Sequence, residues 1–220
     1  MKRVVFVPTS HIAEQSIATV RQVIEDENPD CVAVELDTNR FFAMQRGEQS
    51  NTAALKTLGP TTFFVYFFMK NLQSWLGKKA GIFPGTEMLG AVKAAREKDI
   101  TVVFIDKDIR LTFMEIKKMP AREKFKLLWF LVKASFAIPL SKFFGSSEKI
   151  DLRKIPEKEV ISEAMTLFRK ELPYFYRILV SERDRFMAQR INELLKRFDK
   201  IVVVIGAGHY RGIIKLLETK

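Results

Sequence analysis

The sequence predicts an α/β fold in which a mainly parallel central sheet is flanked by helices. Four short runs rich in β-branched residues are typical of buried strands. They alternate with amphipathic helical patterns, and this strand–helix–strand order is typical of parallel sheets. The predicted strands are residues 3–8, 31–36, 101–105 and 201–205.

The helices are predicted from the spacing of apolar residues. Residues 13–25 place Ile17, Val20 and Ile24 three and four positions apart, which puts them on one helical face. Most of the other positions are polar, so this helix should pack one face on the sheet. The other helical patterns are 38–44, 86–98, 109–118, 173–197 and 210–217.

Residues 111–172 contain no convincing strand and are predicted to form a helical insertion before the last strand. Because that strand should return to the same sheet, we expect one domain over 1–220. Two aromatic segments, 61–75 and 125–144, are expected to form a homo-oligomer face or a helical core. Peripheral contact with a membrane is the alternative. No signal peptide or spanning helix is expected, which favours a cytoplasmic protein.

The formal net charge of +11 favours anionic partners. The basic residues are spread along the chain and mixed with acids, and no nucleic-acid motif is present, so no specific nucleic-acid partner is predicted. The single cysteine, Cys31, excludes a disulfide within the chain, and its apolar neighbours predict a buried thiol.

The two histidines of the chain each follow a predicted strand directly. His11 comes after the first strand and His209 after the last, while Glu35 ends the second and Asp106 follows the third. Carboxyl ends of parallel strands meet at one sheet edge, where ligands usually bind. Two imidazoles with carboxylates are ligands for zinc, manganese or cobalt, which predicts a divalent-metal site. Helix capping is the structural alternative for Asp37, Asp106 and Asp108.

A further carboxylate lies within the pattern at 173–197. Phe175, Leu179, Glu182 and Phe186 follow spacings of four, three and four, which predicts that Glu182 faces inward. A buried glutamate must be paired, metal-bound or protonated, and a buried pair with an arginine is the structural alternative. Glu87 resembles it more weakly, because a negative charge at a helix start is favoured by the helix dipole.

The segment Gly206-Ala207-Gly208-His209-Tyr210-Arg211-Gly212 resembles a dinucleotide-binding loop. No strand and no ribose-binding acid can follow it, so a nucleotide role is rejected. The glycines are expected to allow a tight turn that points His209 back over the sheet edge. The exposed amides there are suited to a carboxylate or an oxyanion.

Six segments occur in the order seen in the TraB/PrgY (pheromone shutdown) family, which the chain resembles. They are residues 9–16, 34–40, 85–88, 105–109, 182–187 and 204–213. That family is similar to Tiki-type metalloproteases and, more distantly, to erythromycin esterases and ChaN-like proteins. The chain departs from it at Pro8, which replaces the glycine of the first Gly-x-x-His motif, and at Lys107, which replaces the arginine of Asp-Arg-Asp.

The resemblance implies a metal-dependent hydrolase of peptide or amide bonds whose metal ligands are His11, Glu35 and His209. Glu182 would complete the metal shell or act as general base, Arg40 or Arg183 would bind a substrate carboxylate or the oxyanion, and Asp184 is expected beside them. The expected substrate-binding residues are Ser10, Glu87, Asp106, Gly206, Gly208 and Tyr210. The alternatives are a metal-free esterase-like hydrolase and a protein that sequesters a peptide or another small anionic ligand.

Overall fold

The computed structural model describes residues 3–9, 14–46, 86–129 and 162–219, apart from 163, 164 and 167. Four parallel strands form one sheet in the order β1-β4-β2-β3. The strands are β1 (Arg3–Thr9), β2 (Cys31–Val34), β3 (Thr101–Phe104) and β4 (Lys200–Gly206). The predicted α/β class and parallel sheet are therefore confirmed.

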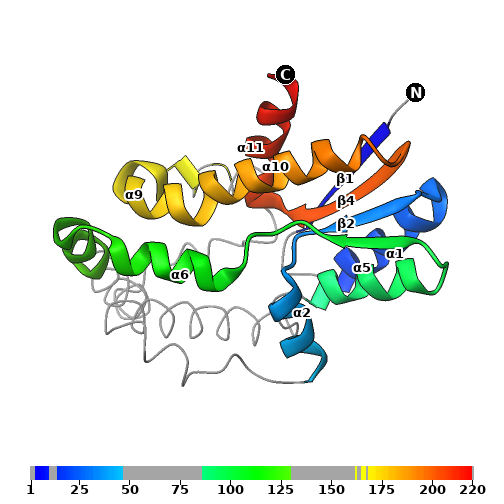
Figure 1. The fold of residues 1–220 in the computed structure, drawn as a ribbon, viewed down its shortest axis with the longest axis horizontal. Helices are drawn as coiled ribbons and strands as arrows, with labels where there is room; N and C mark the ends of the chain where they lie inside the picture. Colours follow the sequence, from blue (N-terminus) through cyan, green and yellow to red (C-terminus); the bar gives the residue numbers. More distant parts are fainter. Residues whose placement is uncertain are drawn as a thin grey trace, which may run out of the picture.

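Helices cover both faces of the sheet (Figure 1). Helices α1 (Glu14–Glu27) and α5 (Thr86–Arg96) lie on one face, and α10 (Glu182–Leu194) and α11 (Ala207–Glu218) lie on the other. Along β4, Val202 and Val204 face the first layer, whereas Ile201, Val203 and Ile205 face the second. Both faces of a covered parallel strand are apolar, which explains the unbroken β-branched runs in the sequence.

Two aspartates start the helices that follow β2 and β3. Asp37 caps α2 (Thr38–Gln45) by accepting hydrogen bonds from the backbone N–H groups of Asn39 and Arg40. Asp108 caps α6 (Ile109–Lys118) through the backbone N–H of Arg110. The capping interpretation is therefore confirmed for these two aspartates, which fixes where the chain turns away from the sheet edge.

A π-helical turn interrupts the predicted helix at 173–197. The segment consists of α9 (Pro173–Tyr176), the π-turn η1 (Arg177–Ser181) and then α10. The wider turn adds one residue and rotates everything after it by about 100°. Glu182 consequently does not lie on a buried stripe: its side chain is 28% exposed, and Phe186 is 39% exposed. Positions 184, 187, 188 and 191 are buried instead.

Within 111–172, the residues that the structure describes are helical or lie in turns and include no strand. The single domain with a helical insertion stays a prediction. The aromatic segment at 61–75 lies outside the described residues, and only 125–129 of the second segment is described, with Phe125, Leu128 and Trp129 exposed. None of the described helices is long and apolar enough to cross a membrane.

The single cysteine lies in the core. Cys31 starts β2 and is fully buried among the residues that α10 and α11 cover. Burial raises the pKa of its thiol to about 11, so it is a neutral packing group at neutral pH. The predicted buried thiol is confirmed.

Candidate functional site

The candidate site lies where the chain leaves the sheet in opposite directions. The chain passes from β1 and β2 toward the layer of α1 and α5, whereas β4 leads directly into α11 in the other layer. Such a switch point leaves a crevice at the carboxyl ends of the strands. Glu35 borders it, and its backbone N–H donates to Val204 of β4 at 2.9 Å. Thr9 of β1 pairs with Gly206 on the other side.

Arg183 connects this edge from the first turn of α10. Nε donates to Asp106 Oδ1 at 2.9 Å, and Nη2 donates to Asp106 Oδ2 at 2.7 Å and to Glu35 Oε1 at 2.6 Å. Nη1 donates to the Leu179 carbonyl oxygen at 3.2 Å and lies 3.1 Å from His209 Nε2. All five N–H donors of the guanidinium therefore have acceptors. Leu179 belongs to the π-turn, so the irregular helix also positions this arginine.

The contacts of His209 define its tautomer. Because a guanidinium only donates hydrogen bonds, His209 Nε2 must be the acceptor from Arg183. The proton then lies on Nδ1, which donates to Asp184 Oδ1 at 2.6 Å. The single lone pair of Nε2 accepts the hydrogen bond from Arg183, and Nε2 also lies 3.4 Å from Glu35 Oε1. The hydrogen bond between the Asp184 carboxylate and the His209 imidazole is the arrangement found in general bases and in metal-binding histidines.

Gly212 makes the pairing of Asp184 with His209 sterically possible. It lies three residues after His209 in α11, beneath the carboxylate of α10. A Cβ atom at position 212 would lie 2.1 Å from Asp184 Oδ2. Only glycine lets the two helices bring these groups together without displacing the carboxylate.

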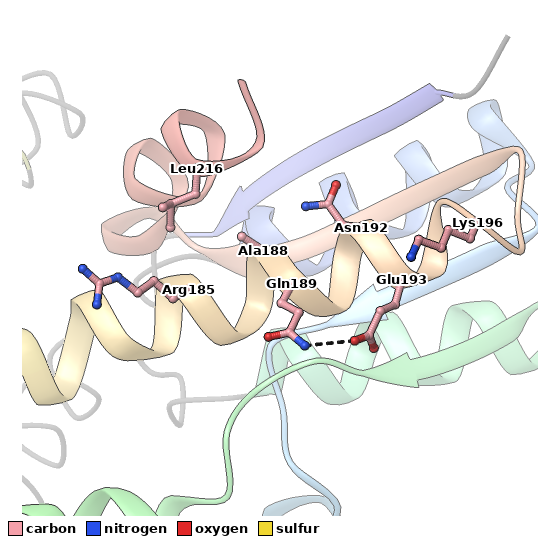
Figure 2. Close-up of a pocket in the computed structure, with 7 residues that line it drawn as sticks. All are labelled: Arg185, Ala188, Gln189, Asn192, Glu193, Lys196 and Leu216. Carbon is pink, nitrogen blue, oxygen red and sulfur yellow. Dashed lines mark hydrogen bonds between the residues drawn. The ribbon is translucent and has the colours of Figure 1, made fainter. Parts of the chain in front are cut away.

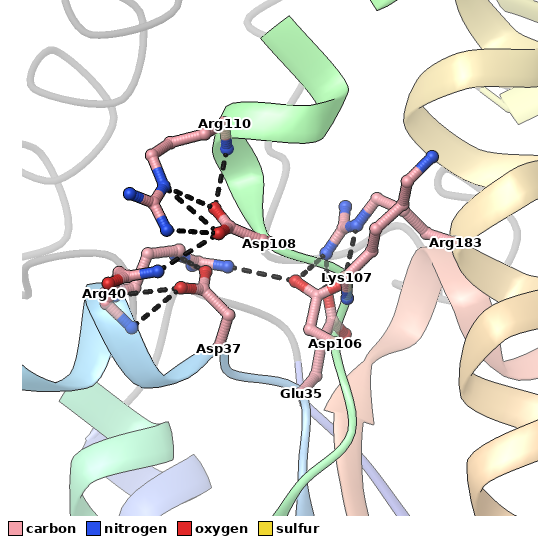
Figure 3. Close-up of polar contacts among 9 residues, drawn as sticks. Glu35, Asp37, Arg40, Asp106, Lys107, Asp108, Arg110 and Arg183 are labelled. Atoms are coloured by element: carbon pink, nitrogen blue, oxygen red, sulfur yellow. Dashed lines mark hydrogen bonds and ion pairs between the residues drawn. The ribbon is translucent and has the colours of Figure 1, made fainter. Parts of the chain in front are cut away.

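Asp106 joins two arginines at the edge of the sheet (Figure 3). Its Oδ2 accepts from Arg40 Nη1 at 3.1 Å and from Arg183, and its Oδ1 accepts from the backbone N–H of Lys107 at 2.8 Å. The Asp106 side chain is 1% exposed. This carboxylate is thus directed toward the two arginines rather than toward the open crevice.

The buried charges shift the pKa values of the site. Burial alone would raise the pKa of Glu35, but electrostatic interactions with His209 and Arg183 and the N–H of Gly206 outweigh it and lower this pKa to about 2. Burial raises the pKa of Asp184, against the opposing effect of His209. Burial opposes the charge of Arg183, yet Asp106 and Glu35 raise its pKa. Glu35 is therefore ionised, and Arg183 stays protonated.

The lowered pKa of Glu35 predicts a loss of stability in acid. The pKa of Glu35 is lower in the folded state than in the unfolded chain, so the ionised carboxylate stabilises the fold. This contribution to the free energy of unfolding is complete above about pH 4.5 and is lost as the pH falls toward about 2. We expect the free energy of unfolding to fall by at most about 3 kcal/mol over this range from Glu35. Urea unfolding between pH 7 and pH 2.5 measures it. Glu35→Gln should remove this part of the pH dependence, and identical slopes in both proteins would contradict the assignment.

The other predicted site residues lie as follows. Gly206 donates its backbone N–H to Glu35 Oε2 at 2.6 Å. Glu182 faces Lys107 and Arg177, with nearest N···O distances of 3.4 and 3.5 Å. Glu87 is buried in the first turn of α5, and Tyr210 stacks edge-on against Phe6. Gly208 lies in the first turn of α11, whereas Ser10 and His11 lie outside the described residues.

Two sequence-based expectations about the last helix were wrong. The helix was predicted over 210–217, but α11 begins at Ala207, so His209 lies in its first turn. Gly206 has a φ of −64°, which any residue can adopt, so it is not needed for a tight turn. The sequence reasoning also missed two contributors, the Leu179 carbonyl and Gly212. His209 and Gly212 are three positions apart, which places them on the same face of a helix. This spacing was the one indication in the sequence that Gly212 lies beside the site.

A shallow hollow of about 600 Å³ lies on the outer side of α10, beside the end of α11 (Figure 2). It is lined by Arg185, Ala188, Gln189, Asn192, Glu193, Lys196 and Leu216. None of these residues belongs to the charged network around Arg183. The hollow is therefore separate from the candidate site.

The described residues do not by themselves complete a metal site. Among them, no group of three or more histidine, cysteine, aspartate and glutamate side chains is arranged to hold a metal ion. The nitrogen of His209 and the oxygen of Glu35 have suitable donor chemistry, but the guanidinium of Arg183 contacts both atoms. His11, the third predicted ligand, is not among the described residues.

Comparison with known proteins finds relatives across almost the whole chain. A sequence model of the TraB/PrgY/gumN family matches residues 2–220. "Uncharacterized protein MJ1365" of Methanocaldococcus jannaschii is 34% identical over 216 residues, which cover 96% of this chain and 52% of that protein. The "TraB domain-containing protein" of Homo sapiens and that of Bos taurus are each 24% identical, over 99% and 97% of this chain and 63% and 62% of their own lengths. The chain spans about half the length of the first relative.

Proposed function

Because this chain belongs to the TraB/PrgY/gumN family, we propose that it is a hydrolase of peptide or amide bonds in which His209 is the reactive base. The observation that carries the proposal is the 2.6 Å contact between His209 Nδ1 and Asp184 Oδ1. It holds the imidazole in the tautomer whose Nε2 can accept a proton. The same logic activates nucleophiles in unrelated hydrolases, where a carboxylate orients a histidine.

The residues around Nε2 suit the hydrolysis of an amide by water. In the resting structure Arg183 Nη1 occupies the lone pair of His209 Nε2, at 3.1 Å. When Nη1 moves aside, a water that binds at Nε2 gives its proton to Nε2 as its oxygen attacks the carbonyl carbon. The negative charge that develops on the carbonyl oxygen is stabilised by the Nη1–H of Arg183 that has left Nε2, while Asp106 and Glu35 still bind Nε and Nη2 of this guanidinium. Imidazolium then returns the proton to the leaving nitrogen as the C–N bond breaks. His209 thus accepts the proton from water and returns it to the leaving nitrogen, so the reaction needs no second acid or base.

A metal-dependent form of the same hydrolase is the second candidate. It is favoured by the 3.4 Å separation of His209 Nε2 and Glu35 Oε1 and by Asp184, which orients the imidazole as outer carboxylates do for metal-bound histidines. A zinc, manganese or cobalt ion held by these atoms and His11 would supply an activated water. In this form, Arg183 would have to break its contacts with His209 Nε2 and Glu35 Oε1.

Substituting His209 tests the role of the base. With a library of internally quenched peptides as substrates, we expect kcat/KM to fall at least about 100-fold in His209→Gln. Asp184→Asn should lower kcat/KM as well, because it no longer fixes the tautomer. Arg185→Gln is the matched control, since Arg185 lies on the outer side of α10. Unchanged cleavage in His209→Gln would refute the proposal, and binding of peptides without cleavage by the wild type would favour a sequestering protein.

Metal analysis separates the two forms of the hydrolase. Wild type that cleaves after exhaustive chelation, with no metal detected by mass spectrometry, supports His209 as a free base. Activity that is lost on chelation and restored by zinc, manganese or cobalt supports the metal-dependent form. In that case His11→Ala and His209→Ala should each lower the metal content.

A further inference from the structure

Building on the proposed hydrolase, we propose that Arg40 binds the terminal carboxylate of the substrate, so that the site selects peptides with a free carboxyl end near the bond that is cleaved. Arg40 lies in the first turn of α2, directly after the edge of β2. Its position relative to Arg183 and His209 carries the inference.

Arg40 and Arg183 are held side by side by one oxygen atom. Asp106 Oδ2 accepts from Arg183 Nη2 at 2.7 Å and from Arg40 Nη1 at 3.1 Å (Figure 3). Arg183 in turn contacts His209. A group bound to Arg40 would therefore be separated from the His209 imidazole by the guanidinium of Arg183, at the same edge of the sheet.

The two arginines differ in how many donors they can offer a ligand. The five N–H groups of Arg183 all have acceptors, and its side chain is 15% exposed. Arg40 is 35% exposed, and within the described part of the chain its guanidinium donates one hydrogen bond, to Asp106. Its Nε lies 4.0 Å from Asp37 Oδ2, beyond hydrogen-bonding range. Arg40 thus retains the paired donors that recognise a carboxylate through two parallel hydrogen bonds.

The acids around Arg40 have other partners, except that Asp37 Oδ2 is buried, accepts no hydrogen bond from the described residues and lies 4.0 Å from Arg40 Nε. Asp106 is shared with Arg183, and Asp37 Oδ1 accepts the two backbone N–H groups that start α2. Asp108 is bound by Arg110 Nη2 at 2.7 Å and by Asn39. Among the described residues, Arg40 Nη2 donates to none of these acids and so remains for an anion, which also agrees with the net charge of +11.

A binding experiment tests this selection without relying on cleavage. The probe is a library of fluorescein-labelled tetrapeptides without aspartate or glutamate, prepared once as free acids and once as carboxyl-terminal amides. Anisotropy is measured on the full chain carrying His209→Gln, so that no probe is consumed. We expect the acids to bind at least about tenfold more tightly than the amides, since a charge-assisted pair is lost in the amide.

Variants of two arginines complete the test. Arg40→Gln should abolish the difference between acids and amides, and Arg40→Lys should keep only part of it because the planar fork is lost. Arg185→Gln, on the outer side of α10, is the control and should keep the full difference. If the His209→Gln chain with its native Arg40 binds acids and amides equally tightly, the proposal is wrong. A difference that persists in folded Arg40→Gln, or amides with an internal glutamate that bind as tightly as the acids, also overturns it.

The failure of this inference is distinguishable from the failure of the hydrolase proposal. If wild type cleaves acids and amides with equal kcat/KM, the hydrolase proposal stands and the selection by Arg40 is wrong. If acids bind through Arg40 but no peptide is cleaved, the carboxylate site is supported and the hydrolase proposal is wrong.

Discussion

Replacing Arg183 by methionine is expected to lower the free energy of unfolding by about 3–5 kcal/mol. The guanidinium is 15% exposed and neutralises Glu35 and Asp106, whose side chains are 10% and 1% exposed. Methionine fills much of the same volume but leaves the buried Glu35 carboxylate without the cation that binds it and leaves Asp106 with Arg40 as its remaining guanidinium partner. Urea unfolding at pH 7, followed by circular dichroism, measures the loss.

Two comparisons identify the cause of that loss. Arg185→Met, two positions further along α10 on its outer side, should change the free energy of unfolding by less than about 0.5 kcal/mol. Adding Glu35→Gln to Arg183→Met should recover part of the stability, because the buried charge that has lost its guanidinium partner disappears. A loss below about 1 kcal/mol in Arg183→Met would show that the network is not buried in the folded protein.

Substituting Gly212 by alanine is expected to destabilise the protein by about 2–5 kcal/mol and to separate Asp184 from His209. The new Cβ would lie 2.1 Å from Asp184 Oδ2 and 2.9 Å from its Cγ, so the carboxylate must move. His209 Nδ1–H then loses its acceptor, and the tautomer is no longer fixed. Nitrogen-15 NMR of the imidazole detects the change directly, and urea unfolding gives the loss of stability.

Gly208 provides the control for this substitution. It lies in the same helix, but a Cβ there would be 3.5 Å from Met165 Cε, an ordinary contact. Gly208→Ala should therefore be neutral or stabilising by up to about 1 kcal/mol, because alanine favours a helix. If Gly212→Ala keeps the Nδ1–H form and the stability of the wild type, the proposed steric requirement is wrong.

The strands and the helix starts were predictable because local chemistry dictates them. A run such as 201–205 has no polar face, so it must lie in a sheet covered on both sides. Asp37 and Asp108 precede helical patterns with side chains that can accept backbone N–H groups, which allowed their capping roles to be named. These features depend on neighbours within a few residues.

The inner surface of α10 was not predictable, because it depends on the π-turn before it. Regular helical spacing directs Glu182 inward, whereas the added residue in η1 brings Arg183 and Asp184 to the site. No residue in Arg177–Ser181 breaks a helix by its own preference, so the sequence carries no local sign of the turn. Tertiary contacts of Arg183 with Glu35 and Asp106 compensate for the irregular backbone. The joint role of His11 and His209 stays a prediction.

The order of the strands also bears on when the site comes into existence during synthesis. The last strand of the sheet, β4, lies between β1 and β2 and pairs Arg3 with Lys200. While the ribosome is still making the middle of the chain, β1 has no neighbour in the sheet, and β2 can pair only with β3. Contacts between such distant residues form slowly. Glu35 Oε2 accepts a hydrogen bond from the N–H of Gly206. The charged network can therefore form only after residue 206 has left the ribosome and β4 has inserted between β1 and β2.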